Sequence, residues 1–218
     1  MALKRCTARA CAIAGVLVAS PVAAANGGWV SFHDPREHAF TTEVPADWIV
    51  RGGLFRLGYS DYRPMVDLTS ADGKASVRFR DVTIPTYFFP TQFHPTEGEV
   101  NDLGAQAQGI FARYRSGSEY ARLYALTRFK GSCHTLTPAK DEWKPPLPAT
   151  VKRSGTWSEG SVAYRCDSAA GVRTAYVDAV TAIVQPSFWQ VVNLVSFVAP
   201  QPQVGFVHAI IVRAERTT

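Results

Sequence analysis

The stretch "FWQVVNLVSFVAP", residues 188–200, restricts the fold more strongly than any other part of the sequence. Alternate residues of a β-strand point to opposite faces of its sheet. Here both sets are apolar, with Val192, Leu194 and Val198 on one side and Trp189, Val191, Val195 and Phe197 on the other. A strand that is apolar on both faces is covered on both faces, so we expect it to run through a sheet with a packing layer on each side.

The segments before this strand predict further strands joined by hairpins. Residues 64–81, "PMVDLTSADGKASVRFRD", place the turn residues "ADG" between two runs with strand character. Val77 and Phe79 alternate with Arg78 and Arg80, which predicts one dry and one wet face. Because the connections are hairpins and not helical crossovers, we expect a largely antiparallel sheet.

Three helices are expected beside the sheet. Ser116 and Glu119 have the spacing of a capping box, and Gly131 suits a C-terminal cap, which predicts a helix between them. The inner face of this helix is expected to consist of Tyr120, Leu123, Tyr124 and Thr127. Further helices are expected over residues 103–115 and about 202–216. With helices on both faces, the predicted fold class is α+β, an α/β/α sandwich with a largely antiparallel central sheet.

The first 25 residues have the pattern of a cleaved secretory signal peptide. Lys4, Arg5 and Arg9 precede an apolar run over residues 10–22, which is too short to span a bilayer stably, and three alanines follow at residues 23–25. The alternative is a buried N-terminal helix. We expect cleavage after residue 25, a single domain over residues 26–218 without a transmembrane segment, and a periplasmic or extracellular location.

Removal of this segment changes both the charge and the cysteine content. The remaining chain has 20 basic and 18 acidic residues, and this small excess does not favour nucleic acid as a partner. Cys133 and Cys166 are the two cysteines left, and an even pair in an exported chain predicts a disulfide. A reactive thiol beside His134 is the alternative interpretation.

Residues 29–48, "WVSFHDPREHAFTTEVPADW", contain an aromatic-x-aromatic-x-Asp strand followed by a strand ending in Val-Pro-x-x-Trp. This pattern resembles the start of PsbP, the extrinsic subunit of photosystem II, and of related bacterial exported proteins including the DcrB type. The resemblance implies an α/β/α sandwich and a PsbP-like domain. It implies no catalytic residues, and the fold does not transmit a function. The chain departs from these relatives in its expected disulfide and in the proline-rich loop over residues 137–153.

The sequence "FHDPREHAF" offers the best set of metal-ligand residue types. His33, Asp34, Glu37 and His38 lie within six residues, and imidazoles and carboxylates are the ligands that zinc and similar ions bind. The alternative is an ordinary turn, because turns collect Asp, Pro and charged residues for backbone reasons. The sequence has none of the common nucleotide-binding or hydrolase motifs, and no cofactor is expected.

Aromatic residues crowd the segment 82–95, "VTIPTYFFPTQFHP". Tyr87, Phe88, Phe89 and Phe93 lie among three prolines, which disfavour a central strand. The rings either cover the core or form an exposed recognition patch, with Arg78 and Arg80 at its edge.

These observations favour an exported, non-enzymatic accessory or binding protein that acts through surface contacts. Its partner would be an envelope protein or a small ligand. A periplasmic enzyme of unrecognised type, metal-assisted through the turn at residues 33–38, is the alternative. The two differ in what a structure should contain: a pocket that gathers titratable groups for an enzyme, or a broad apolar or aromatic patch for an interaction protein.

Overall fold

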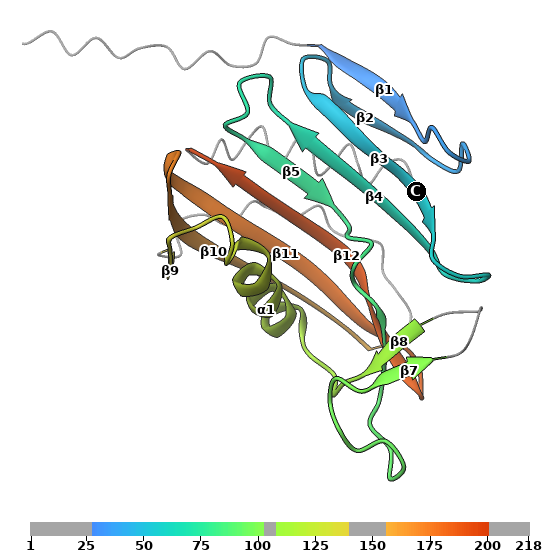
Figure 1. The fold of residues 1–218 in the computed structure, drawn as a ribbon. Coiled ribbons are helices and arrows are strands. Elements are labelled where there is room, and N and C mark those ends of the chain that lie inside the picture. The colour runs from blue at the N-terminus through green and yellow to red at the C-terminus, as the bar shows by residue number, and fades with distance from the viewer. Residues whose placement is uncertain (1–27, 103–107, 140–155, 201–218) are drawn as a thin grey trace, which may run out of the picture.

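The computed structural model describes residues 28–102, 108–139 and 156–200. Within these ranges the chain forms twelve strands and one helix (Figure 1). In chain order they are β1 (Trp29–His33), β2 (Thr41–Pro45), β3 (Ile49–Arg56), β4 (Tyr62–Thr69), β5 (Ser76–Phe79), β6 (Thr86–Phe88), β7 (Val100–Asp102), β8 (Gln108–Phe111), α1 (Gly117–Phe129), β9 (Thr135–Pro138), β10 (Trp157–Ser168), β11 (Gly171–Gln185) and β12 (Phe188–Ala199).

Ten of these strands form one sheet. Its main path runs β3-β4-β5-β12-β11-β10-β9, and every pair along it is antiparallel, as predicted. A side branch joins β6 to β12, β8 to β6 and β7 to β8, and the β6–β8 pair is parallel. β1 and β2 form a separate hairpin.

The predicted α/β/α sandwich is wrong. Strands dominate the described residues, and α1 is the one helix among them. The expected helix over residues 103–115 is contradicted by β8, which occupies Gln108–Phe111 and completes the parallel β6–β8 pair. The expected helix at residues 202–216 and the signal peptide lie outside the described residues.

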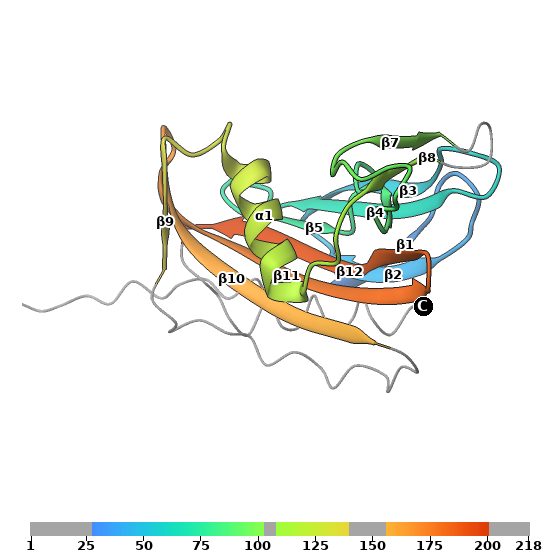
Figure 2. The same cartoon turned by 90° about the horizontal axis from the view of Figure 1, so that it is seen from below.

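The double burial of β12 itself is confirmed, but the predicted faces are partly wrong. Trp189 and Val191 lie with Leu194 and not with Val195, because a register shift at Val192 interrupts the alternation. Leu194 and Val195 point to opposite faces, and both are almost completely buried. On one face, α1 packs across β10 and β11 (Figure 2). On the other face, Val44 of the β1–β2 hairpin packs in one cluster with Val195 and Phe197. A hairpin thus supplies apolar cover that we had expected from a helix.

α1 begins as predicted but presents a different face to the sheet. The Ser116 hydroxyl accepts the backbone N–H of Glu119, whose side chain accepts the Ser116 N–H, which completes the capping box. Tyr120 and Tyr124 are buried, whereas Leu123 is exposed. The other buried positions are small or late in the helix, namely Gly117, Ala121, Ala125 and Phe129. Small residues let the helix lie close to the sheet, which shifts the buried face by one position from the predicted one.

The predicted disulfide is present. Cys133 lies four residues beyond the end of α1, and Cys166 lies in β10, with 5.3 Å between their Cα atoms. The bond therefore fastens the C-terminal end of the helix to the strand on which it packs.

Candidate functional site

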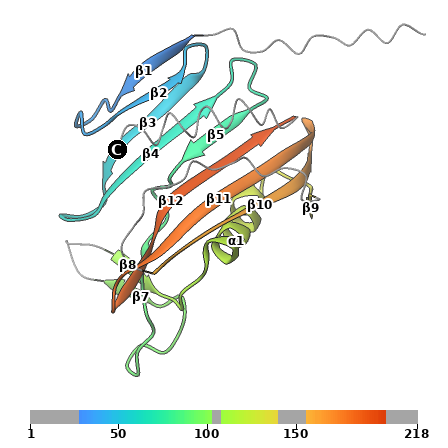
Figure 3. The same ribbon diagram turned by 180° about the vertical axis from the view of Figure 1, so that it is seen from behind.

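Two different strands, β5 and β6, pair with the same edge of β12 and so divide the sheet into two branches there. β5 pairs with the C-terminal part of this strand, at residues 195–198, and β6 pairs with its start, at residues 188–189. Figures 1 and 3 show β5 along one half of β12, with the β7–β8 pair near its other end. The chain between β5 and β6 leaves the sheet, so a hollow opens between the two branches. We call it the fork pocket.

Local backbone chemistry explains why the chain leaves the sheet here. Arg80 has φ of +56°, which a strand residue does not adopt, and its N–H donates to the carbonyl of Leu194 over 2.8 Å. Asp81 then organises a turn, because its carboxylate accepts the N–H and the hydroxyl of Thr83. Pro85 follows and donates no backbone hydrogen bond. These features separate β5 from β6.

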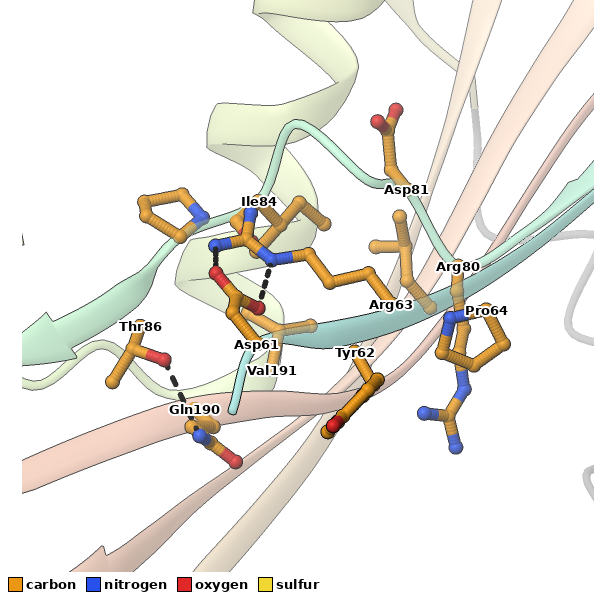
Figure 4. Close-up of a pocket in the computed structure, with 12 residues that line it drawn as sticks. Asp61, Tyr62, Arg63, Pro64, Arg80, Asp81, Ile84, Thr86, Gln190 and Val191 are labelled. Atoms are coloured by element: carbon orange, nitrogen blue, oxygen red, sulfur yellow. Dashed lines mark hydrogen bonds and ion pairs between the residues drawn. The ribbon is translucent and has the colours of Figure 1, made fainter. Parts of the chain in front are cut away.

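The fork pocket has a volume of about 130 Å³, and polar groups from β4, the 80–86 segment and β12 line it (Figure 4). Arg63 holds it together. Its Nε donates to Asp61 over 2.7 Å, and its Nη1 donates to the carbonyls of Val82 and Ile84 over 2.7 and 2.6 Å. On the other wall, Gln190 donates to the Thr86 hydroxyl over 3.4 Å. Arg63 therefore links β4 to the 80–86 segment between β5 and β6. Its charge is neutralised within the fold by Asp61.

Exposed apolar side chains lie beside this pocket. Tyr62 lines it, and the Arg56 guanidinium lies 4.8 Å from the centre of the Tyr62 ring. In the adjoining turn between β3 and β4, Leu57 is exposed and Tyr59 has 83% of its surface exposed. We call Leu57, Tyr59 and Tyr62 the fork rim.

A partly buried ionic network lies behind the pocket. Arg78 forms two hydrogen bonds of 2.6 Å with Asp67 and one of 2.8 Å with Asp81, and Asp81 also accepts the hydroxyl of Tyr124 in α1 over 2.7 Å. Burial raises the pKa of Asp81, but hydrogen bonds from Tyr124, Thr83 and Arg78 outweigh it and set this pKa at about 2. Burial, together with the bond to Asp81, raises the pKa of Tyr124 to about 12. The network links β4 and β5 to the helix.

This network predicts a loss of stability in acid. The pKa of Asp81 is lower in the folded than in the unfolded chain, so its contribution is complete above pH 4 and is lost as the pH falls towards 2. A difference of this size corresponds to about 2 kcal/mol. We expect Asp81→Asn to be less stable than the wild type at pH 6 and to show a smaller further loss between pH 4 and pH 2, measured by urea unfolding. A loss equally steep in both proteins would contradict the assignment.

The structure does not gather the predicted arginines and the aromatic rings into one exposed patch. Arg78 is held between two carboxylates, and Arg80 lines the fork pocket. Tyr87 stacks on Trp189 with 4.2 Å between ring centres, and its hydroxyl lies 3.0 Å from that of Tyr120. Three of the four aromatic residues thus cover the core, since Phe88 packs beside Phe111 and Phe188, and Phe89 packs against the cluster around Trp189.

Phe93 is the exception in this segment. It is 80% exposed, and it lies in the loop that follows β6. The neighbouring His94 is anchored instead, because its ring stacks on Phe111 and its Nδ1 lies 2.7 Å from Glu99. The segment is therefore mainly core cover with one exposed ring.

The turn at residues 33–38 does not gather its four side chains around one point. Asp34 is fully buried and accepts the backbone N–H groups of Arg36, Glu37, Ala39 and Leu54. Burial raises the pKa of Asp34, but these four hydrogen bonds more than offset it and lower this pKa. Glu37 forms a bidentate ion pair with Arg56, and His33 Nδ1 lies 3.0 Å from the Thr41 hydroxyl.

His38, the fourth residue, has φ of +55° within the same turn. In the described residues, no group of three or more His, Cys, Asp or Glu side chains is arranged to hold a metal ion. Asp34 instead organises the link between the hairpin and β3. Gly53 of β3 is part of this link, because a Cβ atom there would lie 2.6 Å from Asp34 Oδ1.

Apart from Arg80, sequence reasoning missed the residues of the fork pocket. Asp61, Arg63 and Gln190 form no recognisable motif, and they meet only because β5 and β6 both pair with β12. No protein-family model, curated protein or solved structure matches the chain. Among the described residues, no helix is both long and apolar enough to cross a membrane.

Proposed function

We propose that the chain is an exported, non-enzymatic binding protein that docks an envelope partner protein on the fork rim. The observation that supports this most directly is the exposure of Leu57, Tyr59 and Tyr62 beside a pocket whose charged pair is neutralised internally. Tyr and Arg are enriched in protein interfaces, and Tyr62 already lies under the Arg56 guanidinium.

The ionisable groups support binding over catalysis. The buried carboxylates Asp34 and Asp81 accept hydrogen bonds from within the fold, and Tyr124 donates to Asp81. These groups have shifted pKa values for structural reasons, because each is part of a contact between elements. The proposal of export is based on the sequence pattern of residues 1–25. The proposed relationship to PsbP-like proteins is based on the hairpin motif of residues 29–48 alone.

The docking proposal predicts a selective loss of partner capture. A double variant in which Ser replaces Tyr59 and Tyr62 should capture a discrete partner from the envelope fraction at least about 10-fold less well. The reason is that truncating a tyrosine at the centre of an interface can cost more than about 1 kcal/mol of binding free energy. Phe93→Ser is the control, because Phe93 is about as exposed as Tyr59 but lies in the loop beyond β6. If the double variant captured the same protein as well as the wild type does, the fork rim would not be the docking surface.

A further inference from the structure

A second hollow, with a volume of about 360 Å³, lies where the last turn of α1 meets β3, β4, β5 and β12. It is separate from the fork rim. One row of cross-strand neighbours runs over its floor in the order Arg51, Asp67, Arg78 and Ser196. Neighbours in such a row point to the same face of a sheet, so these side chains face the helix together. We call this hollow the α1 groove.

Ser196 contributes a side-chain hydroxyl to the floor of the groove. Only 3% of its surface is exposed, and it lines the groove. A hydroxyl at this position can donate a hydrogen bond to an occupant of the groove that carries an acceptor oxygen.

The charges around the groove favour an anion as that occupant. Arg78 is matched by Asp67 and Asp81. Arg51 and Arg128 also line the groove, and neither has an ion-pair partner in the part of the chain that the structure describes. Three guanidinium groups thus face two carboxylates, and the two unmatched ones are exposed and able to meet a carboxylate or phosphate group.

The groove also has apolar walls. Phe129 from α1, Val198 from β12 and Ile49 from β3 line it. A small inorganic anion would leave these walls without a contact, whereas an anion with an apolar tail would cover them. We propose that the α1 groove binds a small amphipathic anion, with its head group at Ser196, Arg51 and Arg128 and its tail against Phe129 and Val198.

Calorimetric titration of the full chain with decanoate tests this proposal. We expect saturable one-to-one binding, with much weaker binding of acetate and of decanol, because the first lacks the tail and the second lacks the charge. Decyl phosphate, titrated in parallel, shows which head group is preferred. Equal binding of decanol and decanoate would overturn the proposal, as would the absence of saturable binding of both anions.

Variants locate the site. Arg51→Gln together with Arg128→Gln should weaken binding of the preferred anion by about 10-fold or more through loss of charge-assisted hydrogen bonds. Ser196→Ala should weaken it by about 5-fold, because one hydrogen bond to the head group is lost. Arg122→Gln is the control for net charge, since Arg122 is an exposed residue of α1 that does not line the groove. Equal weakening by the Arg122 variant, or unchanged binding by the double variant, would contradict the assignment.

Discussion

Replacement of Cys133 and Cys166 together by alanine should lower the free energy of unfolding by about 4 kcal/mol. The two residues are 33 positions apart, and their bond restricts the unfolded chain over that interval. The bond also fastens the end of α1 to β10 in the folded state. Few single contacts in a domain of this size contribute as much, because total stabilities are commonly 5 to 15 kcal/mol.

Urea unfolding of the double variant, and of the wild type with and without dithiothreitol, measures this effect. Reduced wild type should unfold at a midpoint close to that of the variant, and the oxidised wild type at a clearly higher one. If oxidised and reduced proteins unfolded at the same midpoint, the bond would contribute nothing to stability, and the account of how α1 is held would be wrong.

Trp189→Ala should cost about 3 to 5 kcal/mol, the second large effect. Trp189 is fully buried on the face of β12 that α1 covers. Its ring stacks on Tyr87 and meets the edges of Tyr114 and Tyr120, and its Nε1 donates to the carbonyl of Ala112 over 3.1 Å. The substitution removes the ring contacts, opens a cavity and leaves that carbonyl without its donor.

Trp189→Phe is the intermediate variant for this test. It keeps an aromatic ring but loses the N–H donor, so it should cost less than the alanine variant. Phe93→Ala should change stability by no more than about 0.5 kcal/mol, because that ring is exposed. A loss below about 1 kcal/mol for Trp189→Ala would show that the cluster around this ring is not packed as described.

Local signals predicted those features that depend on near neighbours. The capping box at Ser116 needs only the spacing to Glu119, and the double burial of β12 follows from its nearly continuous apolar run, although the shift at Val192 put Trp189 on the unexpected face. The 64–81 hairpin is likewise confirmed by the β4–β5 pairing. Cys133 and Cys166 were the two cysteines left after the expected cleavage, so their pairing needed no knowledge of the fold.

Features that depend on distant pairing were not predicted. β8 is a strand because β6 and β7 flank it, which no pattern within Gln108–Phe111 indicates. The identity of the layer opposite α1 depended on where the β1–β2 hairpin packs. The fork pocket needs β5 and β6 to share β12, and the α1 groove needs a cross-strand row from Arg51 to Ser196. Pattern reasoning treats each segment separately and therefore found neither site.

Site-specific photo-cross-linking tests the central proposal, docking on the fork rim, most directly. A photoreactive phenylalanine analogue is placed at Tyr59 in the full chain, and at Phe93 in a matched control, since both positions are highly exposed. Illumination of intact envelopes should give one adduct of discrete mass from position 59 and none from position 93. Equal adducts from both positions, or no adduct from position 59, would contradict the proposed docking surface.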